Sequence, residues 1–408
     1  MTTRSSTKRT IASKGTVSLV LAIGFLAGIV AFAQNGTPIN PNANNVLTVA
    51  AYGDSPYGLN PTDTTQTDKT LAFIESINND PKVDLVLHVG DIHSGKQFCT
   101  EAYDRTIYDL WAAFKNPLIY SPGDNEWTDC HKSGEGGHVE VGGGPVDYAD
   151  GDPLANLDLV RSIFFAVPGY SLGGRKKQVL TQAQNYDPDH PTDGNYVENV
   201  MWEQSKVLFV TVNIPGGSNN DADNWFGQPR TQAQTDEIAQ RTQADLDWLD
   251  AAFAQAQADG SEAVVIQQQA DMWDPDGKAV THLANYEPFI ASIAAHALAF
   301  GSPVLLLNGD SHHYRSDNPF KQGQPCVFEA ATGTDFVDCS SIPASPIYTP
   351  DAWNNHPGYD VPNVHRIVVH GSTEPLEWLR LTITPRTGAP AGSNAFGPFT
   401  WERIALVP

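Results

Sequence analysis

Four apolar stretches of this chain end in the same dipeptide, Gly-Asp. They read AAYGDSP, LHVGDIH, YSPGDNE and LLNGDSHH, and they place Asp54, Asp91, Asp124 and Asp310 at their ends. Glycine lets a backbone turn sharply where a strand stops, and ligands of open α/β sheets bind beyond the carboxyl ends of the strands. One Gly-Asp is an ordinary turn, but the recurrence predicts carboxylates that converge on one cleft. Because converging carboxylates repel one another, we expect metal cations among them, and a two-metal centre would also explain the neighbouring histidines.

Predicted strands and helices alternate in the first third of the chain. Buried strands are expected within residues 45–54, 82–91 and 117–127, with helices over 65–80 and 101–116 between them. This alternation is typical of a parallel sheet covered by helices.

The rest of the chain predicts a second set of elements. Residues 131–195 are rich in glycine, break the alternation and predict a loop-rich insertion. The elements expected after it are a hairpin of 196–202 and 206–213, a long helix closed by Gly260, a strand within 262–273, a helix over 286–301 and the strand before Asp310. The tail, residues 364–385, alternates as antiparallel strands do.

The N-terminus has the features of a secretory signal. A basic start precedes the apolar run 17–33, which ends in Ala-Phe-Ala, a cleavage-site pattern. We expect cleavage after Ala33, a linker over 34–45, a folded domain over 46–408, and a secreted or periplasmic protein. The alternative is a retained membrane anchor, because a run of 17 residues is at the low end for a span. No later segment is apolar enough to cross a bilayer, so we expect no stable membrane insertion after cleavage.

The four cysteines predict two disulfides, because an even count in an exported chain is typical of disulfide pairing. Of the three possible pairings we favour Cys99–Cys130 with Cys326–Cys339, since each pair closes a shorter loop. A zinc site is the alternative, but the sequence contains no C-x-x-C pair.

The charge of the chain excludes some partners. The formal net charge is -23, and loss of residues 1–33 would leave 20 basic against 47 acidic residues, a charge of -27. Phosphate backbones and anionic membranes require a basic surface, so we expect neither nucleic-acid nor anionic-membrane binding. Divalent cations are compatible with this acidity.

The order of the motifs resembles that of the calcineurin-like metallophosphoesterase family, which includes purple acid phosphatases. The matching segments are GDSP, GDIH, GDNE, the strand VVIQQQ and GDSH, and the resemblance covers roughly residues 46–384. The resemblance implies a four-layer αββα sandwich with mixed sheets and a dinuclear metal site at the strand carboxyl ends.

The resemblance also implies a role for each motif residue. Asp54 would bind the first metal, and Asp91 would bridge both metals. Asp124 stands where the family has an Asn ligand of the second metal. Asp310 stands at a His ligand of the second metal, and His312 at a His ligand of the first.

Two expected ligands are replaced in this chain. Pro56 occupies the place of the first-motif His, and His93 is placed to substitute for it. The fourth-motif His is missing. Gln267, Gln268, Gln269 and Asp271 are the available donors there, and we select Gln269.

The general acid is also replaced, because Asn125 stands where the family has a His. An amide cannot deliver a proton to a leaving group. His313 or His131 could do so, or an activated leaving group could need no proton.

Charge counting predicts where a phosphate and the metals would bind. Four carboxylates cancel the charge of two divalent cations, so phosphate attraction must come from elsewhere, and Arg315 and Lys96 are candidates. Asn219 or Asn220 could line the pocket. Oxygen donors favour Mn, Mg or Ca at the second site, whereas imidazole at the first site also suits Fe or Zn.

These expectations combine into one function and one alternative. The function is a secreted hydrolase of small-molecule or polymer phosphate esters that uses a metal-bound hydroxide. The alternative is a non-catalytic protein of the same fold that binds metal or another ligand, which the replaced general acid and the missing fourth-motif His would explain.

Overall fold

The computed structural model describes residues 46–140, 144, 146–220, 223–274, 283–329, 336–339, 351–373, 375–385 and 394–406. All of them lie in one structural unit, residues 39–408. The predicted signal (1–33) and linker (34–45) lie outside the described residues. Among the described residues, no helix is both long and apolar enough to span a membrane.

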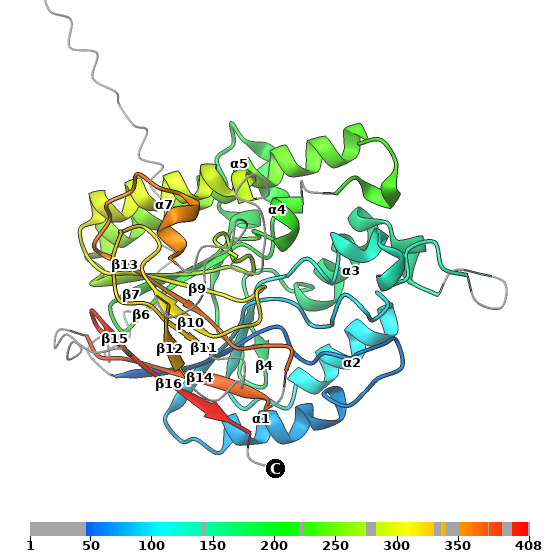
Figure 1. Ribbon diagram of the computed structural model, residues 1–408, viewed down its shortest axis with the longest axis horizontal. Helices are drawn as coiled ribbons and strands as arrows, with labels where there is room; N and C mark the ends of the chain where they lie inside the picture. Colours follow the sequence, from blue (N-terminus) through cyan, green and yellow to red (C-terminus); the bar gives the residue numbers. More distant parts are fainter. Residues whose placement is uncertain are drawn as a thin grey trace, which may run out of the picture. The chain divides into compact units, whose positions relative to one another are not determined.

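Two mixed β-sheets form the centre of this unit (Figure 1). The first sheet has the order β15-β16-β14-β1-β2-β3-β4, in which β1, β2 and β3 are parallel and the other neighbours pair antiparallel. Its strands are β1 (Leu47–Tyr52), β2 (Val83–His88), β3 (Pro117–Tyr120), β4 (Leu172–Gly173), β14 (Glu377–Ile383), β15 (Ala395–Phe396) and β16 (Phe399–Ala405).

The second sheet has the order β12-β11-β10-β13-β9-β8-β7-β6-β5. Its four inner strands β13, β9, β8 and β7 are parallel, and its outer strands pair antiparallel. The strands are β5 (Leu180–Thr181), β6 (Val200–Gln204), β7 (Val207–Thr211), β8 (Ala263–Gln267), β9 (Val304–Asn308), β10 (Arg315–Asp317), β11 (Val327–Glu329), β12 (Phe336–Asp338) and β13 (Val364–Val368).

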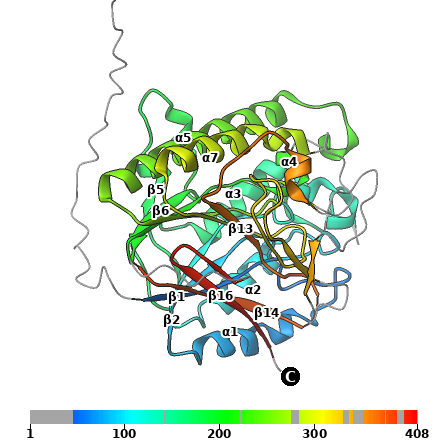
Figure 2. The ribbon, with the colours of Figure 1, turned by 60° about the vertical axis from the view of Figure 1, so that its left-hand side comes forward.

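Helices cover the outer face of each sheet (Figure 2). Residues of α1, α2 and α3 pack in one apolar cluster with the first sheet, and residues of α5 and α7 pack in another with the second. The helices are α1 (Thr70–Asn78), α2 (Glu101–Trp111), α3 (Pro153–Phe164), α5 (Gln232–Asp259) and α7 (Glu287–Phe300). The predicted helices and the stop at Gly260, whose φ of 65° is left-handed, are confirmed.

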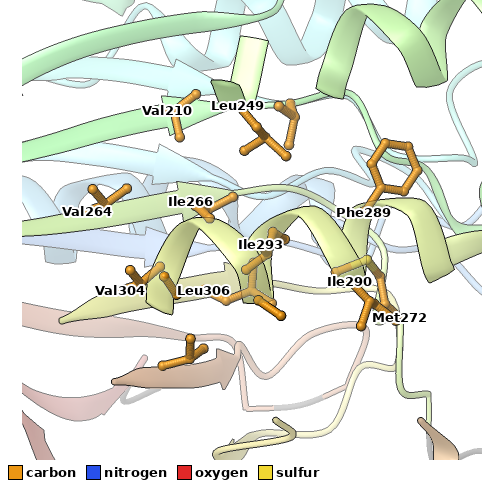
Figure 3. Packing of buried hydrophobic residues seen from close by; sticks show 14 of the residues in the cluster. Val210, Leu249, Val264, Ile266, Met272, Phe289, Ile290, Ile293, Val304 and Leu306 are labelled. Atoms are coloured by element: carbon orange, nitrogen blue, oxygen red, sulfur yellow. The ribbon is translucent and has the colours of Figure 1, made fainter. Parts of the chain in front are cut away.

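Alternation along the strands explains the layers. In β1, Val49 and Ala51 belong to the cluster between the sheets, whereas Ala50 and Tyr52 belong to the cluster beneath α1 and α2. In β8, Val264 and Ile266 face the helices in the same manner, as Figure 3 shows. Each sheet is therefore buried on both faces, and the predicted four-layer αββα sandwich is confirmed.

The two strands of the tail each have an antiparallel neighbour, but in different sheets. Both β13 and β14 alternate as expected, but they lie in different sheets and do not pair with each other. β13 pairs parallel with β9 and antiparallel with β10, whereas β14 pairs antiparallel with β1 and β16. Alternation identifies the buried face of a strand but does not choose its neighbour.

The predicted disulfides are confirmed. Cys99 pairs with Cys130 at a Cα–Cα distance of 5.8 Å, and Cys326 pairs with Cys339 at 5.3 Å. The described residues contain no free cysteine, so no thiol among them is left to ligate zinc.

Candidate metal centre

Sharp turns at the strand ends bring the site together. Asp54 follows β1, Asp91 follows β2, and Asp310 and His312 follow β9. These four residues have left-handed backbones, with φ of 48°, 59°, 74° and 66°. Left-handed backbone is uncommon for residues other than glycine and concentrates at functional sites. Here it turns each side chain back across the end of its strand.

Asp54, Asp91 and His312 form the centre of the site. Each offers a ligand atom, and these atoms lie within 4.8 Å of one another. Asp54 Oδ1 lies 3.6 Å from His312 Nε2, while Asp54 Oδ2 is buried and has no hydrogen-bond partner within the described part of the chain. A buried carboxylate oxygen without a partner is costly, and a cation would satisfy it. The donor set and this oxygen therefore fit a metal ion.

A second group of predicted ligands lies beside the first. Gln269 donates from Nε2 to Asp124 Oδ1 at 2.9 Å, and its Oε1 accepts from Gly216 N. A Cβ added to Gly216 would lie 2.4 Å from Asp124 Oδ2 and 2.8 Å from Asp310 Oδ1. The two carboxylates therefore face the same small space. Asp310 N donates to Asp54 Oδ1 at 3.0 Å, which connects this group to the first.

Tyr57 is a site residue that the sequence reasoning missed. Its hydroxyl donates to Asp91 Oδ2 at 2.7 Å and lies 3.4 Å from His312 Nε2. Asn125 Nδ2 donates to the same Asp91 oxygen at 3.1 Å and to the Tyr57 hydroxyl at 2.9 Å. In the sequence, Tyr57 stands three residues after Asp54, in GDSPY, but no tyrosine was predicted as a site residue.

Asn125 therefore orients its neighbours in this geometry. Besides Asp91 and Tyr57, its amide donates to the backbone carbonyl of His93 at 2.9 Å. The hydrogen atoms of this amide are engaged with oxygens already at the site. Asn125 thus stands at the position predicted from its motif, with the geometry of a group that holds Asp91 in place.

His93 lies next to this network but outside the three-residue cluster. It is buried, its Nδ1 lies 3.2 Å from the Ser94 carbonyl, and its Nε2 has no hydrogen-bond partner among the described residues. Burial lowers its pKa to about 4, so the ring is neutral and able to ligate. Its role as a ligand stays a prediction.

The predicted substrate-binding residues are placed differently. Arg315 is buried in β10, where its Nε donates to Asp317 Oδ2 at 2.8 Å. Asn219 is buried against α5, where Arg241 donates to its side-chain oxygen and its Nδ2 donates to Thr242 Oγ1 at 3.0 Å. These contacts engage both side chains within the protein and give no support to a substrate contact.

The other expected phosphate ligand and the proposed proton donors are also described. Lys96 is exposed, five residues beyond Asp91. The His313 ring lies 5.6 Å from that of Phe328. His131 Nδ1 accepts from Phe226 N at 3.1 Å, and burial lowers the pKa of His131. Neither histidine belongs to the three-residue cluster with Asp54 and Asp91.

An acidic cavity of about 110 Å³ adjoins the second group. Its lining residues are Asp124, Asp129, Lys132, Gly217, Ser218, Asp223, Asp271, Asp274, Leu283, Tyr286 and Asp310. Lys132 Nζ lies 2.6 Å from Asp129 and 3.5 Å from Asp223, so this cation is engaged by carboxylates. A cavity so lined attracts cations and repels anions.

The electrostatics of the centre also favour cations. Burial raises the pKa of Asp54, Asp91 and Asp310 well above the usual range, and the Asp124 carboxylate raises each of them further. Burial raises the pKa of Asp124 as well. The ionised state of this group is therefore unfavourable without a neutralising charge, which a divalent ion would supply.

A comparison with models of protein families gives a match, which covers about the first half of the chain. A family model described as calcineurin-like phosphoesterase matches residues 47–249. The match includes the first three Gly-Asp motifs, while the fourth lies beyond it. No curated protein matches the chain.

The comparison with solved structures includes a plant phosphatase. It is a purple acid phosphatase isolated from yellow lupin (Lupinus luteus) seeds, with a TM-score of 0.39 and 11% sequence identity. The alignment covers 89% of this chain and 52% of the lupin chain. This chain thus spans about half the length of that phosphatase.

Proposed function

We propose that this chain, a member of the calcineurin-like phosphoesterase family, hydrolyses phosphate esters with the help of two divalent metal ions. One observation carries the proposal: Asp54, Asp91 and His312 converge, and the buried Asp54 Oδ2 has no hydrogen-bond partner in the regions that the structure describes. A family match alone would be compatible with a degenerate site. The convergent and unsatisfied donors favour a site that still binds metal.

We assign the proposed ligands to two sets. Asp54, Asp91 and His312 would hold the first ion, with the Tyr57 hydroxyl within reach of it. The second ion would take Asp124, Asp310 and Gln269, together with Asp91 as the shared ligand. When bound, the ions would supply Lewis-acid activation of water and charge neutralisation at the phosphoryl oxygens.

The protein's own groups would position the ligands and admit the substrate. Tyr57 and Asn125 fix the orientation of Asp91 through hydrogen bonds to Oδ2. The acidic cavity beside Asp124 and Asp310 would admit a phosphate ester only when cations offset its charge. Metal loading and substrate binding would therefore be coupled.

The leaving group would have to depart with little protonation. Asn125 cannot deliver a proton, and burial lowers the pKa of His131, which disfavours its protonated form. Neither His131 nor His313 belongs to the cluster of Asp54, Asp91 and His312. We therefore propose that esters of acidic alcohols, such as aryl phosphates, are hydrolysed much faster than alkyl phosphates. The slope of log rate against leaving-group pKa measures this, and a flat dependence would show that a general acid is present.

The two disulfides favour an oxidising compartment, as does the predicted signal. We propose export with cleavage after Ala33. N-terminal sequencing of the exported protein should begin at Gln34, and an intact Met1 in a membrane fraction would support the retained anchor instead.

The decisive experiment is reconstitution of the chelated full-length chain with Mn, Mg, Ca, Zn or Fe, followed by phosphate-release assays on aryl mono- and diesters. Asp91→Asn should lose metal and activity together, because both ions share this ligand. Asp84→Asn is the matched control and should keep both, because Asp84 is an exposed aspartate on β2, the strand that Asp91 follows.

The alternative function is a non-catalytic protein that binds metal. The occupied amide of Asn125 and the replacement of a His ligand by Gln269 are the observations that favour it. If the chain binds metal through Asp91 and releases no phosphate with any ion, the alternative is correct. If the chain binds no metal at all, both functions are wrong.

A further inference from the structure

A second group of metal-type donors lies away from the strand ends. His190, Asp193 and Asp247 each offer a ligand atom, and these atoms lie within 4.8 Å of one another. Asp193 belongs to the short helix η6 (Pro191–Asn195), His190 immediately precedes it, and Asp247 projects from α5. None of the three residues takes part in the candidate metal centre described above.

The burial of Asp193 distinguishes this group from an ordinary cluster of surface acids. Only 1% of its surface is exposed, and neither of its carboxylate oxygens has a hydrogen-bond partner among the described residues. Among the described residues, Asp147 is another buried acid with both oxygens unpartnered, whereas the buried Asp317 is paired with Arg366. A buried carboxyl with no partner costs free energy that a bound cation would recover.

The other two donors are already oriented towards each other. His190 Nδ1 lies 2.6 Å from Asp247 Oδ2, and Gln243 Nε2 donates to the other Asp247 oxygen at 2.9 Å. The His190 side chain is 47% exposed, so solvent can reach the group and complete a coordination shell. Burial and the Asp247 carboxylate also raise the pKa of Asp193 to about 6, as expected where acids crowd without a cation.

We propose that His190, Asp193 and Asp247 bind a single divalent transition-metal ion, with Zn²⁺ as the best match. One imidazole nitrogen and two carboxylate oxygens form a mixed donor set that suits Zn²⁺, whereas Ca²⁺ and Mg²⁺ prefer oxygen donors alone. Three protein ligands leave one position of a tetrahedral shell for water, on the exposed side of His190.

The site would have a structural consequence. It joins η6, at the end of the 131–195 segment, to the middle of α5, which covers the second sheet. A metal bound only in the folded state stabilises that state by mass action. The ion would therefore brace this segment against α5 without taking part in phosphate hydrolysis.

The alternative is a metal-free pair in which Asp193 and Asp247 share one proton. Zinc titration separates the two, using the chelated full-length chain and counting ions retained after gel filtration. His190→Ala and Asp193→Asn should each retain one zinc equivalent fewer than the wild type. His190 is exposed, so its replacement by Ala keeps the test valid even if the Asp193 variant folds poorly.

His296→Ala is a matched control. His296 Nε2 lies 2.5 Å from Asp250, also on α5, so this pair has the same His-Asp chemistry without the buried third acid. The control should retain the wild-type number of zinc ions, and all the variants should keep the wild-type rate of phosphate release. Zinc should also raise the unfolding midpoint less in His190→Ala than in the wild type.

Equal zinc numbers in the wild type, His190→Ala and Asp193→Asn would overturn the proposal and support the shared proton. Loss of the same equivalent in His296→Ala would overturn it too, because the ion would then depend on any surface His-Asp pair. Loss of phosphate release in His190→Ala would show that the two sites are not independent, which also contradicts the proposal.

Discussion

Replacement of Tyr57 by Phe tests the geometry of the metal centre with the loss of a single oxygen atom. The hydroxyl donates to Asp91 Oδ2 at 2.7 Å and lies 3.4 Å from His312 Nε2, so it contacts two of the three clustered ligands. The ring is buried and its volume is kept by Phe. Tyr57→Phe should therefore weaken metal binding while the sandwich stays folded.

The expected magnitude follows from the contacts that are lost. A hydrogen bond to a charged group contributes about 1.5–3 kcal/mol. Asn125 Nδ2 would still donate to Asp91 Oδ2 at 3.1 Å, but it would lose the Tyr57 hydroxyl as an acceptor. At about 1.4 kcal/mol for each factor of ten, affinity for the first ion should fall about 10- to 100-fold, as is typical for the partners of metal ligands.

The assay is calorimetric titration of the chelated chain with Mn²⁺, together with kcat/KM for an aryl phosphate. Tyr103→Phe is the matched control, because this half-buried tyrosine donates to the carbonyls of Pro56 and Ile92, at 3.2 and 3.0 Å, and not to a proposed ligand. Affinity within about threefold of wild type in Tyr57→Phe, or an equal loss in both variants, would refute the assigned contact.

Three further changes test the same centre. In Gly123→Ala the new Cβ would lie 1.9 Å from Asp91 Oδ1, so metal content and phosphate release should both be lost. Gly144→Ala is the control, because its new Cβ would meet nothing within 4 Å and both properties should be kept. Phosphate release by Gly123→Ala would contradict the geometry of the centre. Burial raises the pKa of Asp129 to about 6 and also raises the pKa of Asp54 and Asp91. Protonation of these carboxyls therefore stabilises the folded state fully below about pH 4, and this stabilisation is lost as the pH rises. The unfolding midpoint of the chelated protein should therefore fall between about pH 4 and 7, and divalent ions should restore it; a rise over this range would be the contrary result. Asp310→His should shift the metal preference towards Zn, measured by reconstitution curves, and an unchanged order of metals would show that Asp310 is not a ligand.

The layers of the fold were predictable because their causes are local. Apolar residues on both faces of β1 and β8 indicated strands buried on both sides, and the Gly-Asp turns marked where the strands end. The pairing of the tail was not predictable in this manner. β13 and β14 carry similar alternation, yet β13 joins the second sheet beside β9 and β14 joins the first beside β1.

Part of the candidate site was predictable from the sequence, and part was not. The convergence of Asp54 and Asp91 followed from the rule that the carboxyl ends of parallel strands share an edge of the sheet. His312 follows β9 of the second sheet, so its place beside them was expected from the family resemblance alone. The burial of Arg315 against Asp317 could not be read from sequence, because a cation two residues beyond a motif can face either the cleft or the sheet. Tyr57 was missed since its role depends on the path of a turn.

The charge of the site bears on the order in which metal and ester would bind. In the acidic cavity, the carboxylate of Asp271 is ion-paired with Arg366 and that of Asp129 with Lys132. These ion pairs engage Lys132 and Arg366, whereas Asp124 and Asp310 face the space beside Gly216. A phosphate that entered first would meet mostly like charge, whereas a divalent ion would meet carboxylate oxygens. If the proposed function is correct, metal should therefore bind before the ester, and the carboxylates that make the empty centre unfavourable would give the ions their affinity.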